Sequence, residues 1–312
     1  MNNIGISFLD YQLPNKSHTL KYLEENNLLN ESANTLSKFG FARCYIEEHH
    51  NIQNLANGVI EKILRQIDFE REKFDYFFMT NAILQTDSVS NQELDMFSYP
   101  IARLQYNYSI NNAKSIALSQ AGCASFLSSI NIARDMIRGN SDNNYILCVG
   151  GDVLPKKSKR DLLYNLVSDA SCAVVIQRNS PANKIISYTQ TTKSSFWDVS
   201  KSKDHLLATY FPTAANNINR SLAEANLSPS DIKYLIPHNV SINSWHILAE
   251  MVGFEKEQLF LDNISKIGHT TQADPIINLK HLIESGKINK GDKLLIFTFG
   301  FGAHWASLIL EY

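Results

Sequence analysis

The sequence has few cysteines, and none of them lies at a spacing typical of a metal site. The four, Cys44, Cys123, Cys148 and Cys172, form no CxxC pair, which argues against a zinc site and against a disulfide framework. Cys148 and Cys172 fall inside short apolar runs, YILCVGG and SCAVVI. We therefore expect these two to be packing residues, and we expect no bound metal.

The sequence also lacks an excess of charge and a long apolar run. Its 29 basic and 31 acidic residues give a net charge of −2, which provides no general attraction to nucleic acid or to an anionic membrane. No apolar stretch approaches the length of a transmembrane helix. The first residues, MNNIGISFLDYQLP, lack the basic region and apolar core of a signal peptide. We expect a cytoplasmic protein.

One local cluster of positive charge stands out, formed by Lys156, Lys157, Lys159 and Arg160. Such a cluster is typical of a solvated loop. It is also compatible with a docking point for a phosphate or for an acidic carrier protein.

Short apolar runs alternate with amphipathic segments along the 312 residues, which predicts a layered α/β fold with largely parallel sheets. Residues 83–100 are expected to form a loop that faces a partner, and the polar segment 178–204 to link two halves. The expected strands are 4–9, 75–79, 115–119, 145–149, 173–177, 234–236, 293–299 and 307–310, and the expected helices are 17–39, 52–67, 101–106, 124–138, 205–225, 243–253 and 275–285.

Two pairs of segments repeat at an offset of about 150 residues. REKFDYFFMTNA is similar in pattern to SPSDIKYLIPHN, and NNYILCVGGD to DKLLIFTFGFG. This offset is far longer than the period of a solenoid, roughly 20–50 residues. It predicts two duplicated α/β halves, residues 1–180 and 181–312.

Cys123 lies at a tight corner, SQAGCAS, between an expected strand and an expected helix. The positive end of a helix and its unpaired N–H groups favour a thiolate over a thiol. Small neighbours leave room for a carbonyl group to approach the sulfur. Cys123 is therefore either a nucleophile or one more small buried residue.

Three later segments end strands or occupy irregular turns: IPHN with His238 and Asn239, GHTT with His269, and GFGAHW with Gly300, Phe301 and Gly302. Ligand sites of parallel α/β sheets form at the carboxyl ends of the strands. These segments could therefore converge on Cys123. Each of them alone is more typical of a structural histidine or a plain turn.

Taken together and in order, QAGCASF, IPHN, IGHTT and FGFGAHWASLIL resemble the motifs of the β-ketoacyl-acyl-carrier-protein synthase III family, within the thiolase-like superfamily. GDVL and SDASCAVV extend the resemblance to nearly the whole chain. It implies a thiolase-like fold, with two βαβαβαββ halves in an α-β-α-β-α arrangement, and usually a homodimer, although a heterodimer is possible.

The resemblance also implies roles. Cys123 is expected to be acylated by an acyl thioester, with the N–H groups of Cys123 and Gly302 as the oxyanion hole. His238 and His269 are expected to hold a malonyl-type thioester as it loses CO2, and Asn239, Gly300 and Phe301 to line the substrate site. No permanently bound cofactor is implied, since coenzyme A or phosphopantetheine serves as the substrate handle, with an acyl carrier protein as partner.

The sequence departs from the family at several points. His269 stands where the family has asparagine, giving a Cys-His-His set. The tryptophan that stacks on the adenine of coenzyme A in the family has no counterpart in this sequence, and Asn34 lies near its place. Ser168-Asp169-Ala170 replaces Gly-Asp-Gly, and Ser241 replaces an asparagine. These changes favour a specialised polyketide or fatty-acid-derived pathway.

Three functions follow as hypotheses. The first is decarboxylative Claisen condensation. The second is transfer of an acyl group to an alcohol or amine with His269 as the base, because an imidazole can accept a proton. The third is a non-catalytic subunit of a heteromeric synthase.

Overall fold

In the core of the first half of the chain, strands alternate with helices until two strands end the half, and short elements are inserted after the first and the fourth of these strands. The structure, a computed structural model, describes residues 3–49, 51–83, 99–163 and 165–312. The order in the first half is β1 (Ile4–Gln12), α3 (Ile52–Gln66), β4 (Tyr76–Thr80), α4 (Pro100–Tyr108), β5 (Lys114–Leu118), α5 (Ser125–Gly139), β6 (Tyr145–Asp152) and β9 (Ala170–Arg178). This is a βαβαβαββ unit.

The second half repeats that order with one reduction. It contains β10 (Lys184–Thr192), α6 (Val199–Ala225), β11 (Ile232–Pro237), α7 (Ile242–Val252), α8 (Ile264–Ile267), α9 (Asp274–Glu284), β12 (Lys293–Gly300) and β13 (His304–Glu311). Where the first half has its third strand, the second has a single bridge between Leu259 and Leu235 of β11. The repeated segments of the sequence occupy equivalent strands, β4 with β11 and β6 with β12.

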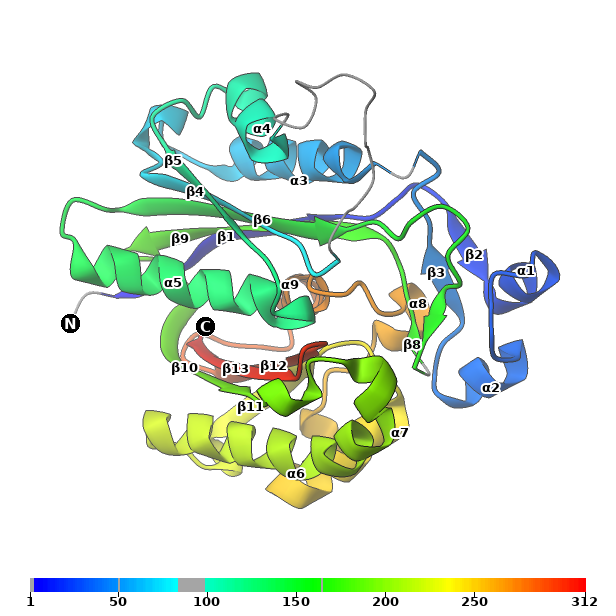
Figure 1. Cartoon of the computed structure of the whole chain (residues 1–312). Coiled ribbons are helices and arrows are strands. Elements are labelled where there is room, and N and C mark those ends of the chain that lie inside the picture. The colour runs from blue at the N-terminus through cyan, green and yellow to red at the C-terminus, as the bar shows by residue number, and fades with distance from the viewer. Residues whose placement is uncertain (1–2, 50, 84–98, 164) are drawn as a thin grey trace.

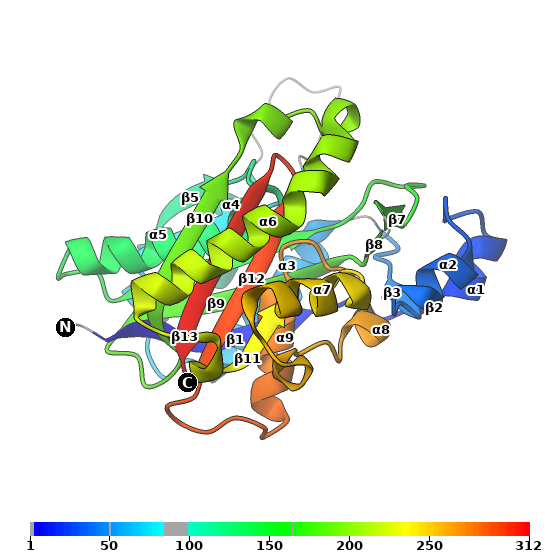
Figure 2. The ribbon, with the colours of Figure 1, turned by 90° about the horizontal axis from the view of Figure 1, so that it is seen from below.

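The strands join in the order β11-β12-β13-β10-β1-β9-β6-β4-β5. The two half-sheets are connected by the pairing of Gly5 in β1 with Lys184 in β10. Helices α5 and α9 lie between the half-sheets, α3 and α4 cover one outer face, and α6 and α7 cover the other (Figures 1 and 2). The fold is therefore five layers deep, as the resemblance implies.

The layers explain the burial of the strands. Every residue of β6 except Tyr145 is buried, because helices cover both faces of its half-sheet. On α3, Leu55, Val59, Ile60 and Ile63 are all buried on one face, as their helical spacing predicts.

Two expectations about the architecture of the sheet are wrong. The pairs β4–β5, β4–β6 and β11–β12 are parallel, but the strands at the centre of the sheet pair antiparallel. The short turn between β12 and β13 allows only an antiparallel pair. Segment 178–204, expected to be a linker, instead contains the strand β10. Its buried Ser187 and Thr189 donate hydrogen bonds to α6.

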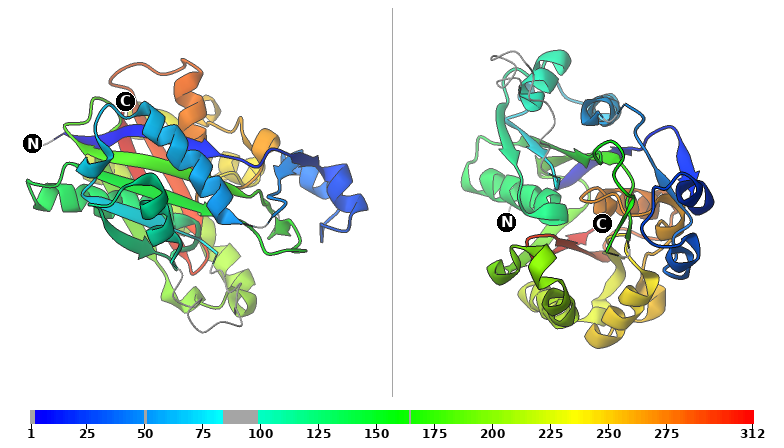
Figure 3. Two further views of the ribbon diagram at one scale, coloured as in Figure 1. Left: turned by 90° about the horizontal axis from the view of Figure 1, so that it is seen from above. Right: turned by 45° about the vertical axis from the view of Figure 1, so that its right-hand side comes forward.

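The expected helix at 17–39 is two helices, α1 (Leu20–Glu25) and α2 (Ala33–Lys38), after a short strand β2 (Ser17–Thr19). Asn27 takes a left-handed conformation, with φ of 54°, and ends the helical path. With β3 (Arg43–Tyr45) these elements project from one side of the molecule (Figure 3).

Most of the loop expected at 83–100 falls on residues 84–98, which lie outside the described residues. Among the residues that are described, no helix is long and apolar enough to cross a membrane.

Candidate functional site

Cys123 sits in a single 3₁₀ turn, Gly122–Ala124, which leads directly into α5. The turn packs tightly against the end of β12. A Cβ atom on Gly300 would lie 2.0 Å from the carbonyl oxygen of Ala121 and 2.8 Å from the backbone nitrogen of Cys123. Glycine is therefore required at 300 for the turn to approach the strand. This packing fixes where the sulfur sits, at the start of a helix.

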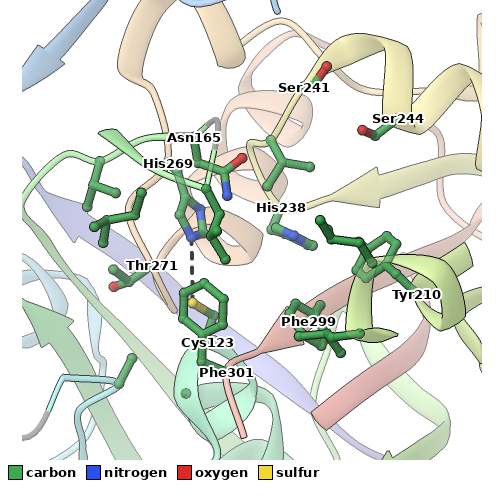
Figure 4. Close-up of a pocket in the computed structure, with 18 of the residues that line it drawn as sticks. Cys123, Asn165, Tyr210, His238, Ser241, Ser244, His269, Thr271, Phe299 and Phe301 are labelled. Carbon is green, nitrogen blue, oxygen red and sulfur yellow. Dashed lines mark hydrogen bonds between the residues drawn. The ribbon is translucent and has the colours of Figure 1, made fainter. Parts of the chain in front are cut away.

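His269 is the immediate partner of that sulfur. Its Nε2 lies 3.5 Å from Sγ of Cys123, and its Nδ1 lies 2.6 Å from Oδ2 of Asp274. The imidazole therefore bridges a thiol and a carboxylate, both buried. Figure 4 shows the contact between His269 and Cys123. The sequence predicted Cys123 and His269 but not Asp274.

Asp274 is held by several further donors. It accepts from the backbone N–H and the hydroxyl of Thr270, at 2.6 Å and 2.5 Å, and from the N–H of Asn239 at 2.6 Å. Burial by itself raises the pKa of this carboxyl, but His269 and these donors more than offset it and leave the pKa below its usual value. Asp274 is therefore an ionised and fixed acceptor for Nδ1 of His269.

The same ion pair acts on the imidazole. Burial lowers the pKa of His269, but the charges and hydrogen bonds of Asp274 and Cys123 outweigh it and raise that pKa to about 10. A protonated imidazole facing a thiolate is the arrangement that activates a cysteine nucleophile. The geometry thus builds a Cys–His–Asp relay.

His238 shares the pocket but differs in charge state. Its ring centroid lies 5.7 Å from that of His269 and 5.0 Å from that of Trp245, and its Nδ1 has no hydrogen-bond partner. Burial first, and then the charge of His269, lower the pKa of His238 to about 3. His238 is therefore neutral at physiological pH.

Cys123, His238 and His269 open onto one cavity of about 540 Å³. Most of its wall is apolar and much of it aromatic, and Tyr210 and Phe301 both pack against Phe299 (Figure 4). Polar groups on the wall include Gln120, Asn165, Ser241, Ser244 and Thr271. A pocket of this size and lining suits an apolar organic group.

Of the three residues expected to line the substrate site, only Phe301 does. Asn239 is buried behind His238, where its side chain donates to the carbonyl of Gly268 at 2.8 Å. Gly300 serves the packing of the Cys123 turn. Their role in substrate binding remains a prediction, because the sequence shows that a residue follows a strand but not which way it faces.

Gly302, expected in the oxyanion hole, does not line the pocket. A Cβ atom on Gly302 would lie 3.0 Å from Nε2 of His304 and 3.9 Å from the carbonyl oxygen of Gln120. The backbone nitrogen of Phe301 lies close to the Cys123 turn, 2.6 Å from where a Cβ on Gly122 would be. The role of Gly302 thus remains a prediction, and the N–H of Phe301 is a second candidate.

The basic cluster is only partly available to a partner. Arg160 is 2% exposed and forms an ion pair of 2.6 Å with Asp169, so its assignment as a docking residue is wrong. Lys159 donates to the carbonyl of Asn27 at 2.6 Å. Lys156 and Lys157 are exposed and remain candidates for docking.

The other cysteines are structural. Burial raises the pKa of Cys44 and of Cys148 to about 12 and also raises that of Cys172 well above its usual value, as expected for packing residues. Within the described residues, no group of three or more His, Cys, Asp or Glu side chains could hold a metal ion.

The sequence is similar to those of one family of known proteins. The family model for 3-oxoacyl-[acyl-carrier-protein] synthase III matches residues 119–194, and the model for its C-terminal part matches residues 222–312. A β-ketoacyl-[acyl-carrier-protein] synthase III from Clostridium beijerinckii is 26% identical over the whole of both chains.

Two solved structures show the same fold. A 3-oxoacyl-[acyl-carrier-protein] synthase III from Aquifex aeolicus has a TM-score of 0.85 and 21% identity, over 99% of this chain and 100% of the other. ChlB3, described as an acyltransferase, has a TM-score of 0.87 and 15% identity, over 99% and 97%. The thiolase-like fold expected from the sequence is confirmed. The two family models together span more than half of the sequence, and this chain therefore belongs to the 3-oxoacyl-[acyl-carrier-protein] synthase III family.

Proposed function

We propose that this protein is an acyltransferase that takes an acyl group from a thioester onto Cys123 and passes it to a hydroxyl or amine acceptor. Family membership supports acyl transfer or condensation as the reaction class. The observation that favours transfer to a protic acceptor is the 2.6 Å contact between Nδ1 of His269 and Asp274. This contact decides which ring nitrogen carries the proton.

The first step starts from a Cys123 thiolate and a protonated His269. The sulfur attacks the thioester carbonyl, a new C–S bond forms, and the bond to the leaving thiol breaks. The leaving thiolate takes the proton from Nε2 of His269. His269 is then neutral and retains its Nδ1 proton on Asp274, so Nε2 presents a lone pair.

The second step uses that lone pair. An acceptor O–H or N–H gives its proton to Nε2 as the acceptor atom attacks the carbonyl of acyl-Cys123. Cys123 leaves as a thiolate, which restores the resting pair with no oxidant or reductant. The N–H of Cys123, with that of Phe301 or of Gly302, provides hydrogen bonds to the oxyanion in both steps.

Decarboxylative condensation is the second candidate, and His238 is the observation that favours it. A neutral imidazole beside the nucleophile can donate an N–H to the enolate formed as CO2 leaves. Condensation in the family pattern requires a second such donor at position 269. Neutral His269 cannot provide it while Asp274 holds the Nδ1 proton.

The pocket suggests the substrates. Its apolar wall suits an apolar acyl group, and coenzyme A or phosphopantetheine is the proposed thioester handle. An acyl carrier protein is the proposed donor partner, with Lys156 and Lys157 as contacts. In the described part of a single chain, β5 pairs only with β4, so its other edge is open to a second chain. A homodimer is the proposed assembly, with a heterodimer as the alternative.

The test combines intact mass spectrometry with a chase. Incubation with a panel of acyl-coenzyme A and acyl-carrier donors should add one acyl mass to the wild type and none to Cys123→Ala. A chase with hydroxyl or amine acceptors should then remove that mass, and a chase with malonyl thioester should release little CO2.

His269→Asn is the matched variant, because it keeps an N–H donor and removes the base. It should lose transfer to hydroxyl and amine acceptors. Efficient release of CO2 by the wild type, without transfer to protic acceptors, would select condensation. Failure of any donor to acylate Cys123 would favour the non-catalytic subunit.

A further inference from the structure

A buried chain of hydrogen bonds runs from the far side of α9 to the catalytic centre. Asn278 donates to Asn239 at 2.9 Å and accepts from Asn263 at 2.8 Å. Asn263 in turn faces Nδ1 of His281 at 2.8 Å, and Nε2 of His281 lies 2.6 Å from the hydroxyl of Tyr11. The three asparagine side chains are at most 1% exposed.

Two backbone carbonyls fix the direction of the bonds between the three asparagine side chains. Asn239 donates its side-chain amide to Gly268, and Asn278 donates one to Pro237 at 2.9 Å. A carbonyl can only accept. The second N–H of Asn278 therefore goes to Asn239, and its own oxygen must accept from the next amide, so only one orientation satisfies the set.

Asn278 is bonded to the turn that carries His238 and is linked through Asn239 to the turn that carries His269. Pro237 precedes His238, and Asn239 follows it. Through Asn239 the chain also reaches the carbonyl of Gly268, the residue before His269. Gly268 adopts φ of 80°, a conformation that favours glycine and that needs its surroundings to hold it.

Asn278 also lies one turn from Asp274 on α9, and His281 lies a further turn along. These positions form a polar stripe, spaced by four and then three residues, along a helix between two half-sheets, where apolar side chains would be expected. A fully satisfied buried amide network rigidifies what it touches. The polar stripe on α9 thus orients the residues that it contacts and contributes little apolar packing.

We propose that Asn278 is a positioning residue for the reaction and that it keeps Nε2 of His269 directed at Cys123. The proposal rests on the role proposed above for His269. Loss of the Asn278 amide frees Asn239 to rotate. The side chain of Asn239 then no longer holds Gly268, and its backbone N–H no longer holds Asp274. His269 is left without a fixed direction.

The test measures the Cys123–His269 pair without any substrate. The rate of alkylation of Cys123 by iodoacetamide is followed against pH, with the adduct quantified by peptide mass spectrometry. Asn278→Leu removes the amide at similar volume, and Asn278→Asp keeps the acceptor oxygen but loses both donors. Leu282→Ala, on the next turn of α9 and fully buried, is the matched control for loss of packing.

Both Asn278 variants should alkylate about 10-fold more slowly than the wild type at pH 7, with the midpoint of the pH profile moved upward. Leu282→Ala should keep the wild-type profile even if its melting temperature falls. A wild-type profile in Asn278→Asp, with only a lower melting temperature, would overturn the proposal. If either Asn278 variant fails to fold, the other carries the test.

One further arm separates this proposal from the proposed function. His269→Ala should also slow alkylation. If His269→Ala alkylates like the wild type, the proposed base is wrong. If it slows alkylation and the Asn278 variants do not, only the positioning role fails.

Discussion

Replacing Asp274 by asparagine tests the proton position at His269 directly. The amide is nearly isosteric, but it removes the charge that raises the pKa of His269 and no longer requires an Nδ1 proton. Burial alone lowers that pKa below its usual value of about 6.5. At pH 7 the histidine in Asp274→Asn should therefore be neutral, with its proton on Nε2.

The expected loss of acyl transfer in Asp274→Asn follows from the contacts between Cys123, His269 and Asp274. Burial lowers the pKa of His269, but Asp274 and Cys123 together outweigh burial and place that pKa at about 10 against a usual 6.5, and Asp274 is the larger of these two causes. In a Ser–His–Asp hydrolase the same change lowers kcat by roughly 10⁴. A cysteine depends less on its base than a serine does, so we expect a loss between about 10² and 10⁴ in acyl transfer to a hydroxyl or amine.

The assay is release of free thiol from a saturating acyl thioester with and without acceptor, alongside release of labelled CO2 from malonyl thioester. Asp274→Asn should lose transfer and keep or gain CO2 release, because Nε2–H can now donate to an enolate. Asp262→Asn, a half-exposed carboxylate paired with Lys287, is the control. Wild-type transfer by Asp274→Asn would refute the relay.

Three further predictions concern the frame of the site. Gly300→Ala should lower the melting temperature and slow alkylation of the nucleophile, because its Cβ would lie 2.0 Å from a backbone carbonyl, while Gly139→Ala, with nothing within 4 Å, should do neither. Arg160→Met leaves the buried carboxylate of Asp169 without its ion-pair partner and should lower the free energy of unfolding, measured in urea, by about 3–5 kcal/mol. An unchanged value would show that the ion pair is dispensable. Since the pKa of His238 is about 3 in the fold and about 6.5 in the unfolded chain, the unfolded state binds more protons below pH 6.5, and stability should fall by about 2–3 kcal/mol between pH 7 and pH 4.5 from this group. His238→Phe should flatten that part of the pH profile, and an unflattened profile would contradict the low value.

The sequence predicted what local patterns determine. The corner at Cys123 and the strand ends before His238 and Phe301 follow from short-range periodicity and turn chemistry, and the structure places all three around one cavity. The two halves were visible because buried strands such as β4 and β11 remain continuously apolar. β10 was missed because its inward Ser187 and Thr189 are satisfied by hydrogen bonds to α6, which no local pattern reveals.

What the sequence did not show is the direction of side chains behind the site. Asn239 and Arg160 are residue types common in binding sites, yet both are buried in bonds to other parts of the fold, Asn239 to Gly268 and Arg160 to Asp169. Asp274 and Asn278 look like ordinary helix residues. One signal was present: a polar residue at every turn of an otherwise apolar segment, DPIINLKH, which predicts a buried polar stripe.

In the proposed function, the class of reaction depends on Asp274, a residue that does not line the cavity. A histidine at position 269 alone is compatible with two chemistries, because its Nε2 can donate to an enolate or accept from a hydroxyl or amine. An asparagine at that position can only donate through its amide nitrogen. Asp274 removes the ambiguity by holding the Nδ1 proton, and so it makes Nε2 of the neutral ring an acceptor. In this chain a carboxylate stands behind the second histidine, and this is why the proposed function is transfer to a hydroxyl or amine rather than condensation.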